Sequence, residues 1–450
     1  MIVIEYKIKA KQYQLAAIDE AIRTSQFVRN KALHYWLDNR GVNKYDLNKY
    51  CRVIAKEYSF ANELNSTARQ SSAERAWSAI SRFFDNCKKQ IKGKKGFPKF
   101  KKHSRSVEYK QSGWKLDETT KKHITFTDKK GIGRLKLVGS RDIYFYQPEE
   151  IKRVRLIRRA DGYYCQFCIS IEVKENVEPT GKAIGLDVGL KYFYADSFGH
   201  TEVNPRFYRQ GEKRLNLFNR RKSKKFKKRT SAVLGSQSLA GVPPVVGTGV
   251  VSPMSDSFKK AKPQSNNYHK AKIRYARLHL RISRQREEHA KSRARTVCTS
   301  NDCIVYEDLQ VKNLVRNSKL SKSISDAGWT QFRRWVEYFG WKMGKITIAV
   351  PPQYTSQDCP SCGKRVKKSL STRTHVCECG YTEDRDIAAS INILKKGLCT
   401  AGHAGTYASP QTGFPPQGTG VYATGDLPSW SSGVNLLANG ESMNVESPTK

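Results

Sequence analysis

Residues 181–199 of the chain read GKAIGLDVGLKYFYADSFG. The apolar run from Ala183 to Leu186 predicts a buried strand, the next glycine predicts a tight turn, and YFYAD predicts a returning strand. Asp187 stands at the end of the first strand. A carboxylate at a buried strand is costly unless a cation or a partner compensates its charge. Asp187 is therefore either a turn residue between glycines or a ligand in a charged site.

Two acidic residues further along the chain occupy comparable positions. Glu307 ends the apolar run in CIVYEDL, and Asp386 opens the predicted helix in EDRDIAASINIL. Alone, Glu307 could cap a strand and Asp386 could be a helix N-cap. Their neighbours Asp308 and Asp384 are weaker candidates for a site, because Glu307 directly follows its strand and Asp386 leads directly into its helix.

The order of strand Asp, strand Glu and helix-start Asp is more specific than any one of these residues. Carboxylate oxygens are hard ligands that suit a hard cation such as Mg²⁺. We expect Asp187, Glu307 and Asp386 to bind two Mg²⁺ ions about 4 Å apart, one activating water and one stabilising the leaving 3′ oxygen. The sequence thus predicts an enzyme that hydrolyses phosphodiesters.

Four cysteines form two close pairs ahead of the last of these acids, C-x-x-C and then, after a spacer of 14 residues, C-x-C. The four are Cys359, Cys362, Cys377 and Cys379. Their spacing predicts a tetrahedral structural zinc site, a zinc ribbon at about residues 355–383. The second pair is C-x-C where C-x-x-C is usual, and His375 is an alternative ligand. Because Asp386 follows seven residues after Cys379, we expect the ribbon to position that carboxylate.

The charge of the chain indicates its partner. It contains 82 Lys and Arg against 40 Asp and Glu, a net charge of +42. Residues 398–450 carry a net −2, which leaves about +44 on the first 397 residues. Such an excess predicts a nucleic-acid partner, with a ribosomal or chromatin-type binder as the alternative. No apolar run is long enough to span a membrane, and the N-terminus lacks a signal-peptide core, so we expect a cytoplasmic, nucleoid-associated protein.

The first 180 residues combine strand-like and helical patterns. Residues 1–10 and about 130–175 are strand-rich, the latter through GRLKLV, DIYFYQ, VRLIRR and YYCQFCISIEV. Apolar residues at helical spacing predict helices over about residues 12–92. Basic residues beside aromatic rings suit a nucleic-acid backbone, although a solvated basic loop is the alternative. The predicted contacts are Arg69, Arg75 and Arg82 on a helix, then Lys94, Lys95, Lys99 and Lys101 in KKGFPKFKK.

From residue 181 onward, predicted strands alternate with amphipathic helices. DAGWTQFRRWVEYFGWKMG predicts one such helix, and KITIAVPP predicts the strand after it. Basic helices flank residues 231–258, a Gly-, Pro-, Ser- and Val-rich stretch with Asp256 as its one charged residue, which predicts a flexible insertion. The composition of residues 398–450 predicts a disordered tail.

GLDVGLKYFYADSFG, VYEDLQVKNLVRN, SDAGWTQFRRWVEYFGWKMG and the cysteine segment through IAASINIL together resemble the TnpB (OrfB) family of transposon-encoded proteins, relatives of type V CRISPR effectors. The resemblance covers roughly residues 1–397. It implies a multidomain α+β and α/β fold. Residues 1–180 would form a nucleic-acid-binding β-barrel wedge with a helical recognition insert. Residues 181–397 would form a RuvC (RNase H-like) nuclease domain that holds the zinc ribbon.

The resemblance also implies an activity. Asp187, Glu307 and Asp386 match the catalytic triad of the family, and the four cysteines match its zinc ligands. The implied reaction is RNA-guided cleavage of double-stranded DNA beside a short flanking motif, with a guide RNA transcribed from the transposon end. Ala388 stands where the family often has Asn, and the insertion at 231–258 interrupts a basic region.

Two other classes of function fit parts of the sequence. An unguided transposase or a junction resolvase also uses RNase H-like carboxylates, but a resolvase would be shorter and would lack the ribbon. A cleavage-inactive, guide-dependent DNA-binding regulator would show the loss of a triad acid, and here all three acids are present.

Overall fold

The computed structural model describes residues 2–90, 93–120, 122–139, 143, 145–171, 174–226, 264–369 and 372–400. The chain divides into two compact units, and the second of them begins at Val177. The insertion predicted at residues 231–258 lies outside the described residues, as does the predicted tail after residue 400.

The first unit contains a seven-stranded antiparallel sheet in the order β2-β6-β7-β1-β5-β4-β3. Its strands are β1 (Ile2–Lys9), β2 (Ser106–Lys110), β3 (Trp114–Leu116), β4 (His123–Phe126), β5 (Gly133–Val138), β6 (Ile151–Arg159) and β7 (Gly162–Ile169). Alternating side chains from these strands face one core, which Tyr109, Phe167 and Leu135 fill without exposure.

The two edge strands of this sheet are neighbours in sequence. One 3₁₀ turn, Gln111–Gly113, joins β2 to β3, so the sheet curls until its edges adjoin. No ladder pairs β2 with β3 in the part of the chain that is described, and the sheet is therefore not the closed β-barrel that we expected. The turn explains the seam, because it takes the backbone out of the extended conformation. A Cβ on Gly113 would lie 2.7 Å from the Thr67 hydroxyl, so the turn is packed too closely for a side chain.

One predicted strand of this unit is wrong. In DIYFYQ, the described residues Ile143 and Phe145–Gln147 form a turn, in which the Tyr146 N–H donates to the Ile143 carbonyl at 3.2 Å. Pro148 follows and starts the 3₁₀ helix η2 (Pro148–Glu150). Proline has no N–H for a ladder, so a strand cannot continue through it. Ile143 is 2% exposed and anchors the turn in the core.

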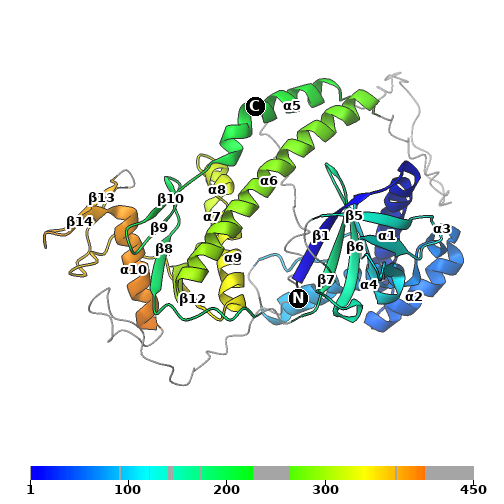
Figure 1. Cartoon of the computed structure of the whole chain (residues 1–450), viewed down its shortest axis with the longest axis horizontal. Helices are drawn as coiled ribbons and strands as arrows, with labels where there is room; N and C mark the ends of the chain where they lie inside the picture. The colour runs from blue at the N-terminus through cyan, green and yellow to red at the C-terminus, as the bar shows by residue number, and fades with distance from the viewer. Residues whose placement is uncertain are drawn as a thin grey trace, which may run out of the picture. The chain divides into compact units, whose positions relative to one another are not determined.

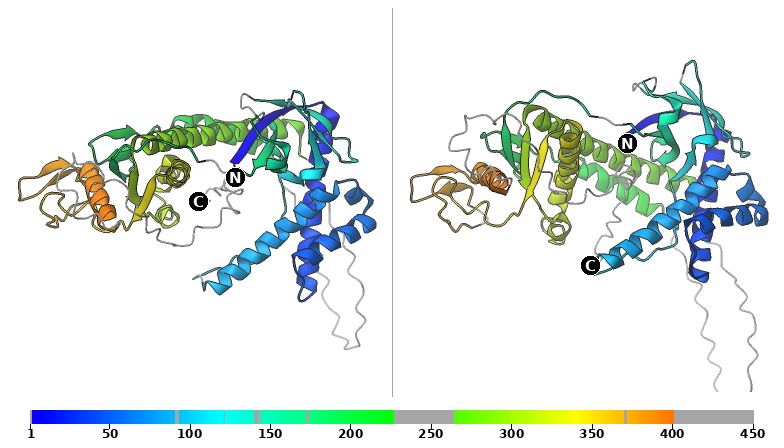
Figure 2. Two further views of the ribbon diagram at one scale, coloured as in Figure 1. Left: turned by 60° about the horizontal axis from the view of Figure 1, so that its bottom comes forward. Right: turned by 90° about the horizontal axis from the view of Figure 1, so that it is seen from below.

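The helical part of the first unit consists of α1 (Gln12–Asp38), α2 (Lys44–Glu57), α3 (Ser59–Asn62) and α4 (Ser66–Lys88). The side chains of Leu33, Leu47, Ile54 and Ile80 form a second core between these helices. The N-terminal half of α1 instead packs Ile18 against the sheet core. Figure 2 shows α1, α2 and α4, in blue, side by side.

The second unit contains a five-stranded sheet in the order β10-β9-β8-β11-β12. Its strands are β8 (Ala183–Asp187), β9 (Tyr192–Asp196), β10 (Thr201–Val203), β11 (Cys303–Glu307) and β12 (Ile346–Val350). β8, β11 and β12 are parallel, whereas β9 and β10 are antiparallel additions. The predicted strand, turn and returning strand at residues 181–199 are thus confirmed as β8 and β9.

Helices cover both faces of this sheet (Figure 1). The helices of the unit are α5 (Phe207–Lys224), α6 (Asn266–Ser300), α7 (Val311–Leu314), α8 (Ser321–Ala327), α9 (Trp329–Lys342) and α10 (Arg385–Thr400), and of these α6, α9 and α10 pack on the sheet. Ile184 and Leu186 pack against α6 and α9, and Gly185, which points the other way, packs against α10. This alternation is the two-residue period of a strand buried on both faces.

The packing of α10 on the sheet is unusually close. A Cβ on Gly185 would lie 2.1 Å from the Ser390 carbonyl oxygen, and one on Gly397 would lie 2.4 Å from a methyl of Val305. The glycines therefore let the helix backbone rest directly on β8 and β11. Because α10 begins at Arg385, this contact also fixes the position of Asp386.

Two helix predictions are corrected in the second unit. The segment DAGWTQFRRWVEYFGWKMG is two helices, α8 and α9, because Gly328 between them has a φ of 72°, which ends a helix. α10 runs to Thr400, past the predicted start of the tail, and Leu398 within it is buried. None of the described helices is long and apolar enough to cross a membrane.

Candidate functional site: strand-end carboxylates and a four-cysteine cluster

Two of the three candidate carboxylates lie at the same edge of the second sheet. β8 and β11 are parallel, and Leu186 pairs with Tyr306 in their register. The next residue on each strand is a candidate, Asp187 on β8 and Glu307 on β11. Neighbouring strands are about 4.8 Å apart, so the two acids stand side by side at the carboxyl ends of their strands.

The third carboxylate reaches the same edge from α10. Asp386 is 8% exposed, and a Cβ on Gly189, in the turn after β8, would lie 3.9 Å from its Oδ2. Asp386 does not cap its helix. The backbone N–H of Asp386 donates to Asp384 Oδ1 at 2.9 Å, so Asp384 is the N-cap of α10. The capping role that was the alternative for Asp386 therefore falls to its neighbour.

The electrostatics of this edge follow from burial and like charge. Burial raises the pKa of Asp187 well above its ordinary value, and the charges of Glu307 and Asp386 raise it further. Burial also raises the pKa of Glu307, against the hydrogen bond that the Thr355 hydroxyl donates to it at 2.6 Å. The repulsion of Asp187 by Glu307 and Asp386 fits a divalent cation, which would compensate the three charges.

The acids next to the candidates have other partners. Asp308 forms an ion pair with Arg333 and is about half exposed. Asp384, besides capping α10, lies 3.3 Å from the Lys191 ammonium. Asp386 also has cationic neighbours, Arg385 at 3.2 Å and Arg373 at 3.9 Å, so ion pairing alone does not separate it from Asp384. The role of Glu307 and Asp386 as metal ligands remains a prediction.

Several residues that support the carboxylates were missed in the sequence. Asn392 of α10 donates to the Thr355 carbonyl at 2.8 Å, which holds in place the residue bonded to Glu307. The Trp329 ring N–H donates to the Gly189 carbonyl at 3.3 Å and so fixes the turn after Asp187. None of these three residues belongs to a local motif for such a role, because each acts on a residue distant in sequence.

A small apolar cluster lies under the loops that follow both strand-end acids. Trp329 and Ile324 are buried in it, and they pack against Val188 and Leu190 after β8 and Leu309 after β11. The helices α8 and α9 therefore support both loops at the edge of the sheet. This cluster restrains the loops that follow Asp187 and Glu307.

The four cysteines come together as predicted. One Sγ atom from each lies within 4.8 Å of the other three, with Cys359 and Cys379 3.6 Å apart and Cys362 and Cys377 also 3.6 Å apart. Tetrahedral zinc with bonds of about 2.3 Å requires sulfur atoms about 3.8 Å apart, so the cluster fits zinc. His375 lies outside the cluster; its buried ring contacts Tyr381 and the Lys368 ammonium.

The cysteine cluster is joined directly to the third carboxylate. A short antiparallel pair, β13 (Thr374–Val376) and β14 (Thr382–Asp384), holds Cys377 and Cys379 in the turn between its strands. The end of β14 is Asp384, the residue that caps α10. A metal bound to the cysteines would therefore stabilise the segment from which Asp386 projects.

The predicted nucleic-acid contacts of the first unit divide into two sets. The side chains of Arg69 and Arg75 form hydrogen bonds with other residues of the protein. Arg69 donates to the carbonyls of Ala61, Asn62 and Leu64. Arg75 donates to Ser106. The others lie at the surface to different extents. Arg82, Lys94, Lys99 and Lys101 are exposed and Lys95 is half-buried. Contacts of all seven residues with nucleic acid remain predictions.

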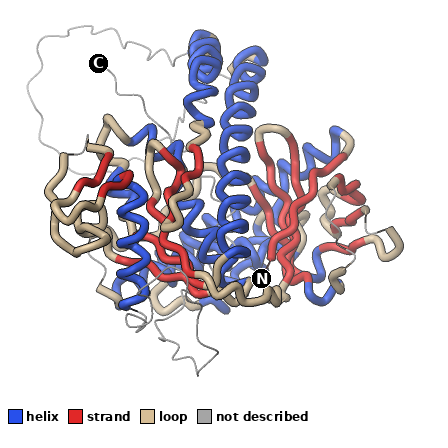
Figure 3. The backbone as a smooth tube through the Cα atoms, turned by 60° about the vertical axis from the view of Figure 1, so that its left-hand side comes forward, coloured by secondary structure: helices blue, strands red, loops and turns tan. Residues whose placement is uncertain are grey.

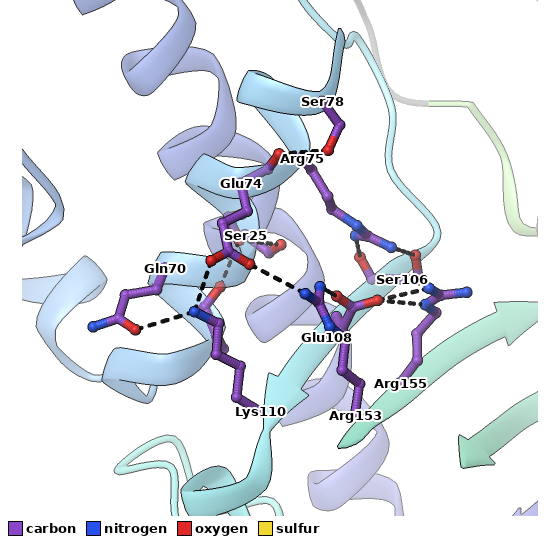
Figure 4. A network of polar contacts seen from close by, with 12 residues as sticks. Ser25, Gln70, Glu74, Arg75, Ser78, Ser106, Glu108, Lys110, Arg153 and Arg155 are labelled. Carbon is purple, nitrogen blue, oxygen red and sulfur yellow. Dashed lines mark hydrogen bonds and ion pairs between the residues drawn. The ribbon is translucent and has the colours of Figure 1, made fainter. Parts of the chain in front are cut away.

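Arg75 adjoins a buried ionic network between α4 and the first sheet (Figure 4). Glu108 on β2 is 3% exposed and accepts hydrogen bonds from Arg153 at 2.7 Å and from Arg155 at 2.6 Å. Glu74 on α4 accepts from Lys110 at 2.8 Å and lies 3.4 Å from Arg153. The network ties α4 to β2 and β6, so it is a structural device of this unit.

Comparisons with known proteins agree with this arrangement. The family model described as "Cas12f1-like, TNB domain" matches residues 329–393, which include the four cysteines and Asp386. The model OrfB_IS605, described as "Probable transposase", matches residues 254–318, which include Glu307.

Two curated relatives match over most of the chain. A protein of Streptomyces pristinaespiralis named "Putative RNA-guided DNA endonuclease" is 26% identical over 414 residues, which cover 88% of this chain and 89% of the relative. A protein of Escherichia coli K12 named "Putative RNA-guided DNA endonuclease InsQ" is 27% identical over 327 residues, covering 68% and 69%. A solved structure of the mini-RNA-guided endonuclease CRISPR-Cas_phi3 is 12% identical, with a TM-score of 0.44 over 88% of this chain and 92% of that chain.

The fold and the site thus define a mixed α/β protein of several domains with a four-cysteine cluster of the zinc-ribbon type. Two segments of the chain match the Cas12f1-like and OrfB_IS605 family models, and the two curated relatives match most of its length. The chain is therefore similar to the TnpB (OrfB) family.

Proposed function

We propose that this protein is an RNA-guided, Mg²⁺-dependent endonuclease that cuts double-stranded DNA beside a short flanking motif. The observation that carries the proposal is the placement of Asp187 and Glu307 at adjoining ends of parallel strands, with Asp386 beside the turn after the first. The raised pKa of Asp187 supports a bound cation, because burial and the two other acids make its free carboxylate unfavourable.

The three carboxylates would hold the metal ions, which when bound supply an activated water and compensate charge on the leaving 3′ oxygen. The protein's own groups orient those carboxylates. Thr355 donates to Glu307, and Asn392 holds Thr355. The ring N–H of Trp329 restrains the turn after Asp187. The four cysteines would bind zinc and hold the start of α10, which carries Asp386.

Two observations support nucleic acid as both guide and target. The net charge of +42 favours binding to a polyanion such as nucleic acid. The relatives that cover most of this chain are named for RNA-guided DNA cleavage. A guide RNA transcribed beside the gene would bring the target specificity, and the nuclease domain would cut whatever duplex is opened.

The first experiment is to express the protein with its flanking genomic DNA, purify it, and sequence the RNA that comes with it. We expect one abundant RNA with a constant scaffold and a variable end. That RNA then serves as guide in a cleavage assay with Mg²⁺. Asp187→Ala is expected to abolish cutting while leaving RNA binding intact, and Asp308→Ala, a matched change at the neighbouring acid paired with Arg333, is expected to cut.

The outcomes separate the candidate functions. Random RNA fragments combined with metal-dependent cutting would indicate an unguided transposase or resolvase. A discrete RNA with no cutting under any divalent cation would indicate a guide-dependent DNA-binding regulator. Cutting by Asp187→Ala at the wild-type rate would show that the carboxylates are misassigned.

A further inference from the structure

The long helix α6, with 35 residues, presents two different faces in its N-terminal half. One face packs against α5, and the two long helices lie side by side (Figure 3). They run in opposite directions, because the end of α5 contacts the start of α6 while Gly211, near the start of α5, lies against Ile282. Tyr268 contacts Phe226 at a ring separation of 5.6 Å, and the Lys222 ammonium lies 4.4 Å from the centre of the Tyr275 ring. Further along, Ile282 is 3% exposed beside α5. This face is part of the unit's packing.

The other face carries a row of cations. At 3.6 residues per turn, spacings of four, three, four and three residues keep side chains on one side of a helix. Five exposed cations follow that spacing, and together we call them the basic stripe. They are Lys270, Arg274, Arg277, Arg281 and Arg284. They occupy a sector of roughly 80°, on the side of the helix away from Tyr275 and Ile282.

The stripe has an uncommon density of one sign of charge. Between Asn266 and Arg286 the helix contains no acidic residue, and Glu287 is the first one. At 1.5 Å per residue the stripe extends over roughly 21 Å, with one cation about every 5 Å. A nucleic-acid strand in a duplex carries one phosphate per about 3.4 Å of axis. The spacing of cations along the stripe is therefore similar to the spacing of phosphates along one strand of a duplex.

We propose that the basic stripe binds the phosphate backbone of a nucleic-acid duplex, without regard to its sequence. The stripe is held straight by the helix, so it matches a stiff polyanion better than a flexible single strand. A surface that binds single strands interleaves its cations with aromatic rings on which bases stack. The side of α6 that carries the stripe has no aromatic residue, since Tyr275 lies on the opposite side.

A membrane is a less suitable partner for the same cations. Helices that lie on lipid insert a broad apolar face and present cations along its borders. In α6 the face with apolar side chains packs against α5, and the stripe lies on the opposite side. Ile273, 43% exposed, is the one large aliphatic side chain beside the stripe with substantial exposure. The charge is therefore presented without the apolar surface that lipid binding needs.

This inference rests on the proposed function only in taking nucleic acid as the partner, and it is tested without cleavage. Full-length protein freed of RNA by nuclease and high salt is titrated into a labelled 30-base-pair DNA duplex in EDTA at several salt concentrations. The test variant carries Arg274→Gln, Arg277→Gln and Arg281→Gln. The control variant carries Lys49→Gln, Arg52→Gln and Lys56→Gln, three exposed cations at similar spacing on α2.

The expected result is a change in salt dependence. Each phosphate contact contributes a slope of about −0.9 to the logarithm of the binding constant against the logarithm of salt. The slope of the test variant should therefore be less negative than that of the wild type by about 2 to 3, and the slope of the control should change by less than about 1. An RNA–DNA hybrid of the same length should behave in the same way, because backbone contacts do not distinguish the two.

Three outcomes would overturn the inference. An equal loss in both variants would show that binding follows net charge alone. An unchanged slope in the test variant, with its thermal unfolding unaltered, would show that the stripe does not contact phosphate. Stripe-dependent binding to anionic phosphatidylserine vesicles but not to duplex would assign the stripe to a membrane. If the wild-type protein showed the salt dependence expected from the stripe but no guided cleavage, the proposed function would be contradicted and the stripe inference would stand.

Discussion

The ionisation of Glu108 is tied to the fold of the first unit. Burial alone would raise its pKa, but the guanidinium groups of Arg75, Arg155 and Arg153 outweigh burial and lower the pKa from 4.5 to about 2. Its ionised form contributes roughly 3 kcal/mol to the stability of the first unit. Because the folded pKa is the lower one, this contribution is complete above about pH 4.5 and is lost as the pH falls toward 2.

Glu108→Gln should therefore destabilise the protein in a way that depends on pH. At pH 7 it leaves buried guanidinium groups without their carboxylate, and we expect a loss of about 3–5 kcal/mol. The loss should shrink below pH 4, as wild-type Glu108 itself becomes protonated. Chemical denaturation at a series of pH values measures this, with Glu63→Gln, in the exposed partner of Lys130, as the control. A loss that stays constant from pH 7 to pH 3 would contradict the assignment.

Thr355 is the residue through which Glu307 is oriented, and its role is testable by a pair of variants. Thr355→Val removes the hydroxyl that donates at 2.6 Å and keeps the side-chain shape. Loss of such support around a metal ligand typically costs about 10–100-fold in activity or metal affinity. We expect a cleavage rate lower by about tenfold and a higher Mg²⁺ requirement. Thr355→Ser, which retains the hydroxyl, should recover both; equal defects in the two variants would indicate a packing role.

At the scale of elements, α10 packs so closely on β8 that one added methyl group should disturb the contact. Gly185→Ala would place a Cβ within 2.1 Å of the Ser390 carbonyl oxygen, so the helix must shift away from β8. Overpacking of this kind costs about 1–3 kcal/mol. We expect that loss in unfolding measurements, together with slower cleavage, because Asp386 moves with the helix. Ser390→Ala, on the other side of the contact, should leave both properties nearly unchanged.

Some elements could be predicted from the sequence and others could not. The strand, turn and returning strand around Asp187 and the helix after Asp386 were predictable, because their patterns repeat within a few residues. The split between α8 and α9 was signalled by Gly328, but a single glycine within an amphipathic pattern is compatible with an unbroken helix. The seam in the first sheet could not be foreseen, because it depends on the packing of Gly113 against Thr67, 46 positions earlier.

The same distinction holds within the candidate site. Three acids and four cysteines could be selected because chemistry restricts which residue types can bind a metal. Their supports could not, since a threonine, an asparagine or a tryptophan has no such restriction. Thr355 bonds to a residue 48 positions away, and Trp329 to one 140 positions away. Only the folded chain brings these pairs together.

For the molecule as a whole, the two compact units predict two unfolding transitions. Each unit has its own buried core, the first around Phe167 and Leu47 and the second around Ile304 and Phe332. Cys362→Ser removes one of four zinc ligands and should lower the second transition while leaving the first unchanged. Cys399→Ser, at an exposed thiol outside the cluster, is the control. Calorimetry with zinc analysis distinguishes this result from a single transition that shifts as one.

The order of the segments around the carboxylates has a consequence for synthesis on the ribosome. Asp187 is translated about 200 residues before Asp386, because the helix that carries the third acid comes last among the described elements. At roughly 5–20 residues per second the interval lasts about 10–40 s. Under the proposed function, a nascent chain would for that time carry basic helices that can bind nucleic acid while lacking one of the three acids of the candidate metal site. Messenger RNA beside the ribosome would then meet a nucleic-acid-binding chain before it meets a nuclease.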